Sequence, residues 1–131
     1  MTGLVVVAHA GLATELIRAA EMIVGPLEGA AAVEIRADDS VETIRTALTA
    51  AIDSVASAEI IIMTDMFGGT PSNMSLSFLQ ESRVEVLTGV NLPMLIRFAS
   101  DRERYGVTEL AAQIKESGRE GVAVAGDYLK K

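Results

Sequence analysis

Hydrophobic positions follow two patterns along the chain: short continuous apolar runs, and longer segments in which apolar residues recur every three or four positions. The short runs are rich in Val and Ile, and the first, at residues 3–8, is GLVVVA. Continuous apolar runs of this length are typical of strands that are buried on both faces of a parallel sheet. Strands are therefore predicted at residues 3–8, 31–36, 59–64 and 84–89.

The segments between these runs show helical spacing and helix-end signals. Gly25 and Pro26 end the first segment, and Ser40 is suited to begin the second. Thr70 is predicted to be the N-cap of the third, with Pro71 at the first helical position. Helices are thus predicted at residues 12–24 and 40–55, from residue 70, and at residues 93–100 and 108–118, and the apolar stretch at residues 121–126 allows one further strand.

Strands that alternate with helices predict an α/β fold of three layers, in which helices cover both faces of an open, mostly parallel sheet. For four strands the common order is 2-1-3-4, which makes the first and third strands neighbours. The 131 residues contain no repeat or linker, so a single domain over residues 1–131 is expected. Ligands bind such sheets beyond the carboxyl ends of the strands, where the direction of winding reverses. The candidate site therefore lies beyond the first and third strands.

Two polar residues follow these two strands. His9, the only histidine, follows the first strand, and Asp65 follows the third. A carboxylate that is hydrogen-bonded to one imidazole nitrogen fixes the tautomer and leaves the other nitrogen free to act as a nucleophile. A lone histidine or aspartate at a strand end is also common as a structural residue, so spacing alone leaves both interpretations open.

Glycines and a threonine surround this pair. Gly68 and Gly69 let the backbone approach a ligand closely, and the Thr70 hydroxyl adds a hydrogen bond or else caps the helix. Helix N-termini are predicted just after both His9 and Asp65, and their free N–H groups favour anions. The loop holds no Lys, no P-loop pattern and no carboxylate cluster for magnesium. The site is therefore expected to take a covalently bound phosphoryl group without a cofactor or metal, although the same residues also suit a tight turn.

Composition narrows the choice of partners. The chain has 11 Lys and Arg against 18 Asp and Glu, and its net charge of −7 repels nucleic acid and anionic membranes. It has no cysteine, which excludes disulfides and thiol chemistry. The N-terminal segment lacks the basic residues and the apolar length of a signal peptide or a membrane span. A cytoplasmic protein that does not bind nucleic acid is expected.

The stretch TDMFGGTPSN, residues 64–73, closely resembles a known signature: Asp, an aromatic residue, and Gly-Gly-Ser/Thr-Pro-x-Asn. This signature belongs to the mannose-family EIIA component of the bacterial phosphoenolpyruvate-dependent sugar phosphotransferase system. The resemblance runs nearly end to end. It includes VVVAHAG at residues 5–11, AAEMIVG at 19–25, GVNLPML at 89–95 and SGREGV at 117–122.

The resemblance implies a phosphoryl carrier. In that family the histidine that matches His9 accepts a phosphoryl group from the phosphocarrier HPr and passes it to an EIIB domain, which phosphorylates sugar during uptake through membrane subunits. Asp65 would orient Nδ1 of the histidine, Nε2 would be phosphorylated, and Thr70 would meet the phosphoryl oxygens. The family fold adds an antiparallel C-terminal edge strand, exchanged in a homodimer, which residues 121–126 would supply. The remaining phosphate-binding and rim positions would be Ala10, Gly11, Phe67, Gly68, Gly69 and Asn91.

Position 10 departs from the family pattern, because the family commonly has glycine where this chain has Ala10. A positive φ at this position would disfavour alanine and affect how the phosphoryl group is placed. Two other functions stay open. One is a regulatory binding protein whose phosphorylation state reports sugar or energy status, and the other is the phosphotransfer subunit of dihydroxyacetone kinase, against which the FGGTPSN loop argues.

Overall fold

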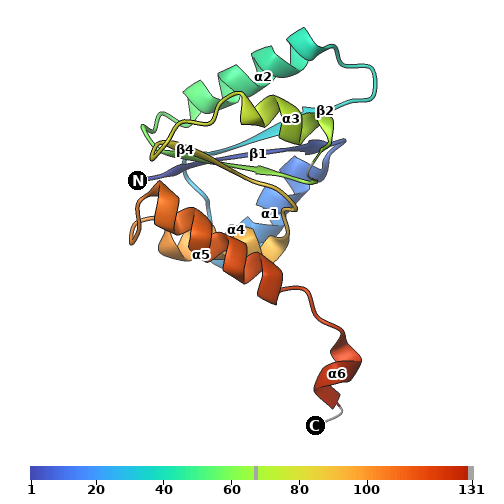
Figure 1. Cartoon of the computed structure of the whole chain (residues 1–131), viewed down its shortest axis with the longest axis vertical. Coiled ribbons are helices and arrows are strands. Elements are labelled where there is room, and N and C mark those ends of the chain that lie inside the picture. Colours follow the sequence, from blue (N-terminus) through green and yellow to red (C-terminus); the bar gives the residue numbers. More distant parts are fainter. Residues whose placement is uncertain (67, 130–131) are drawn as a thin grey trace.

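Four parallel strands form one sheet in the computed structural model, which describes residues 1–66 and 68–129 (Figure 1). The strand order is β2-β1-β3-β4, so the predicted order 2-1-3-4 is confirmed. His9 lies opposite Ile35 in the register of β1 with β2, and Val7 lies opposite Thr64 in the register of β1 with β3. The strands are β1 (Gly3–His9), β2 (Ala30–Ile35), β3 (Ile60–Thr64) and β4 (Val84–Leu87).

Helices cover both faces of this sheet, as predicted. In Figure 1, α2 and α3 lie on one side of the strands, and α1, α4 and α5 lie on the other. Each face has its own apolar core, because alternate residues of β1 point to opposite sides. This explains why the first apolar run is continuous. The helices are α1 (Leu12–Val24), α2 (Val41–Ser54), α3 (Thr70–Leu76), α4 (Leu92–Asp101) and α5 (Val107–Glu120).

The helix ends confirm one predicted cap and correct another. The Ser40 side chain accepts a hydrogen bond from the backbone N–H of Thr43 and so caps α2. In α3, however, the N-cap is Gly69 and not Thr70. Gly69 has the extended backbone typical of an N-cap, with φ −80° and ψ 170°, whereas Thr70 is already helical. The Thr70 side chain therefore does not cap this helix.

The strand predicted at residues 121–126 is absent from the described chain. Residues 122–124 have no regular structure, and a short helix, α6 (Ala125–Leu129), follows. Figure 1 shows this segment extending away from the sheet. A strand needs a neighbouring backbone with which to pair, and within one chain this segment reaches none. A fifth strand is thus not formed within the single chain, and an edge strand exchanged between two copies stays a prediction.

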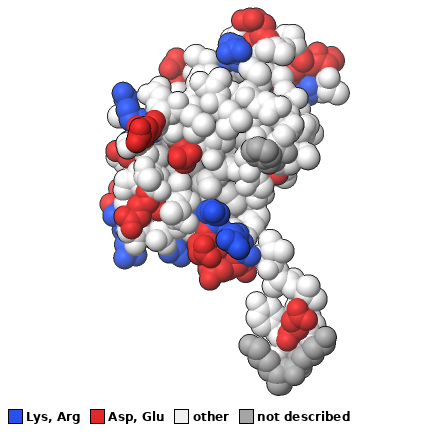
Figure 2. All heavy atoms as spheres, in the orientation of Figure 1, with Lys and Arg blue, Asp and Glu red and all other residues white. Residues whose placement is uncertain are grey.

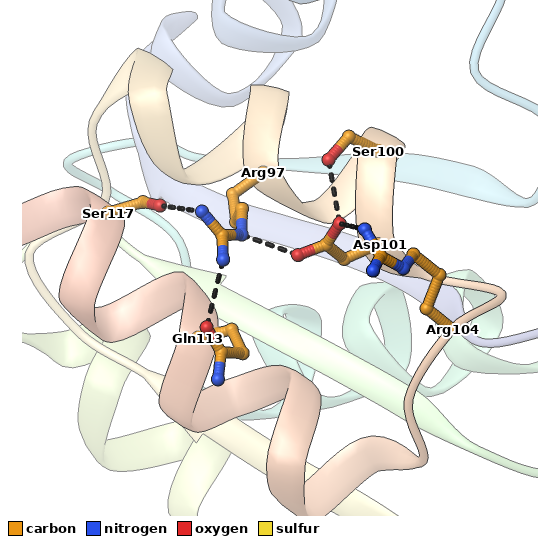
Figure 3. A network of polar contacts seen from close by, with 6 residues as sticks. All are labelled: Arg97, Ser100, Asp101, Arg104, Gln113 and Ser117. Carbon is orange, nitrogen blue, oxygen red and sulfur yellow. Dashed lines mark hydrogen bonds and ion pairs between the residues drawn. The ribbon is translucent and has the colours of Figure 1, made fainter.

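A polar network joins α4 to α5 around the side chain of Asp101, which is only 3% exposed (Figure 3). One Asp101 oxygen accepts a hydrogen bond from Arg97 Nε at 2.5 Å, and the other accepts one from Ser100 Oγ at 2.9 Å. The Arg97 guanidinium also donates to Gln113 and Ser117 of α5. Burial alone would raise the pKa of Asp101, but these hydrogen bonds and the charges of Arg97 and Arg104 hold it below its usual range.

Replacing Asp101 by asparagine is expected to lower the free energy of unfolding at pH 7 by about 2 kcal/mol, because a charge-assisted hydrogen bond inside the protein is lost. The folded-state pKa of Asp101 is lowered, so the unfolded chain binds the proton first as the pH falls. The contribution of Asp101 is therefore present at neutral pH and is lost below about pH 4, and the variant should lose less stability on acidification.

Urea unfolding at pH 7 and at pH 3 measures both effects. Asp53→Asn is a matched control, because Asp53 lies on the exposed side of α2. If the free energy of unfolding falls no further in Asp101→Asn than in Asp53→Asn, the network does not stabilise the fold.

Candidate active site

The ends of β1 and β3 bring His9 and Asp65 together, as the sequence predicted. Asp65 Oδ2 lies 2.7 Å from His9 Nδ1 and also accepts a hydrogen bond from the His9 backbone N–H at 3.0 Å. Because the carboxylate accepts, Nδ1 carries the ring proton, and the lone pair of Nε2 is free. The His9 side chain is 53% exposed and that of Asp65 is 14% exposed. The pair thus has a sheltered carboxylate and an imidazole that another protein can reach.

Asp65 stays ionised in this arrangement. Burial alone would raise the pKa of its carboxyl group. The hydrogen bonds from the His9 backbone and ring and the electrostatic attraction of His9 oppose burial, and the pKa of Asp65 lies below its usual range. At neutral pH the carboxylate therefore carries the negative charge that orients the imidazole and stabilises positive charge on it.

The glycine loop approaches the imidazole closely. A Cβ atom added to Gly69 would lie 3.5 Å from His9 Cε1 and 3.2 Å from Met66 Cγ. Gly68 has φ +84°, a conformation that L side chains rarely adopt. The turn thus explains Gly68, whereas a Cβ at position 69 would meet the imidazole at an ordinary van der Waals distance and would be tight only against the Met66 side chain.

A cavity of about 520 Å³ opens beside the imidazole and brings three predicted residues together: His9, Ala10 and Thr70. Gly11 follows directly as the N-cap of α1. Asn91 does not line this cavity, because its side chain caps α4 through the Met94 N–H and donates to the Gly118 carbonyl. Phe67 lies outside the described residues.

Ala10 adopts the positive φ that the family pattern implied, with a value of +51°. The chain therefore makes the same left-handed turn with alanine, at a cost of roughly 1–2 kcal/mol compared with a right-handed conformation. Its backbone N–H donates to the Ile35 carbonyl at 2.8 Å. That N–H is consequently used within the fold, and the next one available after the turn is that of Gly11.

Comparison with known proteins identifies the family. The family model described as "PTS system fructose IIA component" matches residues 3–115, where PTS is the sugar phosphotransferase system. The chain belongs to the mannose-type PTS EIIA family. It is thus an EIIA component of a sugar phosphotransferase system, and it shares the fold of solved EIIA structures.

Three relatives show how far the similarity of this EIIA component extends. It is 27% identical to the fructose-specific EIIA component of Bacillus subtilis, over 100% of this chain and 91% of the relative. It is 30% identical to the mannose-specific EIIAB component of Escherichia coli K12, over 91% of this chain but 38% of the relative. The crystal structure of an EIIA component from Streptococcus agalactiae superimposes with a TM-score of 0.88 at 27% identity, covering 97% and 99% of the two chains.

The cavity of this EIIA component also contains residues that the sequence did not indicate. Arg36 and Asp39, which follow β2, line it together with His9. A signal for them existed, because the order 2-1-3-4 places β2 directly beside β1. The residues after β2 therefore had to lie at the same edge of the sheet as His9, although only the ends of the first and third strands were considered.

Proposed function

We propose that this EIIA component carries a phosphoryl group on His9 Nε2, accepting it from phospho-HPr and passing it to an EIIB component during sugar uptake. The observation that carries the proposal is the hydrogen bond between Asp65 Oδ2 and Nδ1, which leaves an exposed ring nitrogen with a free lone pair. Membership in the EIIA family supports the same role. In this role residues 1–131 act as one phosphoryl-carrier domain.

The transfer step follows from the geometry of this pair. The Nε2 lone pair forms the new nitrogen–phosphorus bond, while the bond between phosphorus and the donor breaks and its electron pair stays with the donor atom. The Nδ1 proton remains on the ring, where the Asp65 carboxylate offsets the positive charge that develops. The Thr70 hydroxyl, freed from helix capping, and the Gly11 N–H donate hydrogen bonds to the phosphoryl oxygens. The second transfer is the same step in reverse, with EIIB as the acceptor.

The acceptor is inferred from a relative. The Escherichia coli protein is named an EIIAB component, so it contains an EIIB part as well as the EIIA part. We infer that a separate or attached EIIB accepts the phosphoryl group here. This role places the protein in the cytoplasm and connects it with the membrane only through the transporter subunits. A helix that spans a bilayer would have to be longer and more apolar than any helix in the described part of the chain.

Incubation with phosphoenolpyruvate, enzyme I and HPr tests the proposal. We expect the protein to gain one phosphate that is labile in acid and stable in base, and ³¹P NMR should assign it to Nε2 of a histidine. Addition of an EIIB protein should then remove it. A protein that is never labelled would contradict the proposed function. Labelling without transfer to any EIIB would instead favour the regulatory role. Transfer to the nucleotide-bearing subunit of dihydroxyacetone kinase would show that this protein serves as the phosphotransfer subunit of that kinase.

A homodimer is part of the proposal. The described part of the C-terminal segment, residues 122–129, projects from the body and contains one charged residue, Asp127 (Figure 2). Val122, Val124 and Leu129 are 77%, 68% and 85% exposed. Near the start of this segment, a mainly apolar groove runs between α1, α4 and α5. Contact with a second copy would remove this apolar surface from water, which is the usual driving force for such an interface.

Replacing Val124 by aspartate is expected to weaken this dimer about tenfold or more, because a charge would be buried in an apolar contact. Sedimentation velocity over a concentration series measures the change. Val41→Asp is the matched control, because Val41 is 58% exposed and lies on α2, in the other helix layer. A monomeric wild-type protein, or an equal loss in both variants, would contradict the proposed interface.

A further inference from the structure

We propose that Arg36 binds the phosphoryl group while it is attached to His9. Arg36 is the only Lys or Arg among the described residues that line the cavity beside His9. The inference rests on the proposed function and assigns a role to a residue that neither the family signature nor the predicted site contains.

The charges around the cavity favour a cation there once His9 is phosphorylated. Asp65 is ionised next to the ring, and Asp39 lines the same cavity. A phosphoryl group brings further negative charge into this cavity, so a cation within it would stabilise the phosphorylated state. A planar guanidinium is the best matched side chain, since its parallel N–H groups can bind two phosphoryl oxygens at once.

The backbone places Arg36 next to the turn that follows His9. The Ile35 carbonyl accepts the Ala10 N–H at 2.8 Å, and the Arg36 N–H donates to Asp39 Oδ2 at 2.9 Å. Arg36 thus directly follows β2, beside the turn that follows His9, and neighbouring strands are about 4.8 Å apart. The extended arginine side chain is longer than this separation. An Arg36 side chain that rotates away from Glu34 would therefore span the distance between the two strands.

The side chain is also free to make this movement. It is 71% exposed, and its one ion pair within the described residues joins the guanidinium to Glu34 Oε1 at 3.5 Å. The other oxygen of Glu34 already accepts a hydrogen bond from Thr14 Oγ1 at 2.7 Å. An exposed pair of this length contributes little to stability, so leaving it costs little. Arg36 would thus exchange a weak contact with Glu34 for a charge-assisted contact with the phosphoryl group.

The experiment compares phosphoryl transfer from HPr to wild type, Arg36→Gln, Arg36→Lys and Arg45→Gln. Arg45→Gln is the matched control, because it makes the same change of charge on the exposed side of α2, away from the cavity. We expect kcat/KM for His9 labelling to fall about tenfold in Arg36→Gln and less in Arg36→Lys. The control should stay within about twofold of wild type.

NMR of the arginine Nε–H groups separates contact with the phosphoryl group from docking of the donor. The Arg36 resonance, identified by its absence in Arg36→Gln, should shift when His9 is phosphorylated, and the Arg45 resonance should not. A rate for Arg36→Gln within twofold of wild type, an equal loss in Arg45→Gln, or an unmoved Arg36 resonance would each overturn the inference. Failure to label the wild type would instead reject the proposed function, and the inference would fall with it.

Discussion

Replacing His9 by glutamine is expected to abolish phosphate labelling by phosphoenolpyruvate, enzyme I and HPr. His9 is the only histidine, and the chain has no cysteine that could carry the group instead. Glutamine can still donate its side-chain N–H to Asp65 Oδ2, but its amide nitrogen has no lone pair available for attack. The fold should survive, because the side chain of His9 is 53% exposed. The free energy of unfolding should change by no more than about 1 kcal/mol.

Radiolabelling followed by acid and base treatment measures this loss. Urea unfolding of the variant, carried out in parallel, separates a chemical loss from misfolding. Label that persists in the folded variant would show that another residue is phosphorylated. The stability of that label in acid and in base would identify the type of residue that carries it. An acyl phosphate on Asp65, for example, would be lost in base, whereas a phosphate ester on a serine or threonine would withstand acid.

The sheet and its helices could be predicted because each element has a strong local signal. The continuous run at residues 3–8 is apolar on both sides, and β1 is indeed buried between two cores. Ser40 signals the start of α2 and caps it. The stretch at residues 121–126 has an equally apolar pattern, but a strand also requires a partner, and pairing is a property of the whole fold. Local pattern therefore could not give the single-chain conformation of this segment, and its pairing with a second copy stays a prediction.

The centre of the site could be predicted for a topological reason. Once the strand order was inferred, His9 and Asp65 had to meet, and they lie within hydrogen-bond distance. The positions around them depend on backbone detail that spacing does not reveal. Gly69 rather than Thr70 ends up as the N-cap of α3, and Asn91 is used to cap α4. Arg36 was missed because the residues that follow β2 were not considered as part of the site.

Replacing Asp65 by asparagine is the second change with a large expected effect, a fall of roughly a thousandfold in the rate of His9 labelling. Asparagine is nearly the same size, but the one atom Oδ2 accepts both His9 contacts, and an amide places either its oxygen or its NH₂ group there. It carries no charge to offset the imidazolium, and its NH₂ group can donate to Nδ1. The ring proton would then move to Nε2, where it occupies the lone pair needed for attack. The loss should therefore appear in the transfer step rather than in binding of HPr.

Single-turnover labelling, together with ¹⁵N NMR of the His9 ring, tests this explanation. The rate should fall in Asp65→Asn, and the ring nitrogens should show a larger share of the Nε2–H tautomer than in wild type. Asp38→Asn is the matched control, because it removes one negative charge from the exposed loop after β2 and leaves the Asp65 contact with His9 intact. Asp65 does not position the histidine if His9 is labelled in Asp65→Asn at a rate within a few-fold of the rate in this control. The same conclusion follows if the ring keeps the wild-type tautomer. The short contact between the two side chains would then serve the fold and not the chemistry.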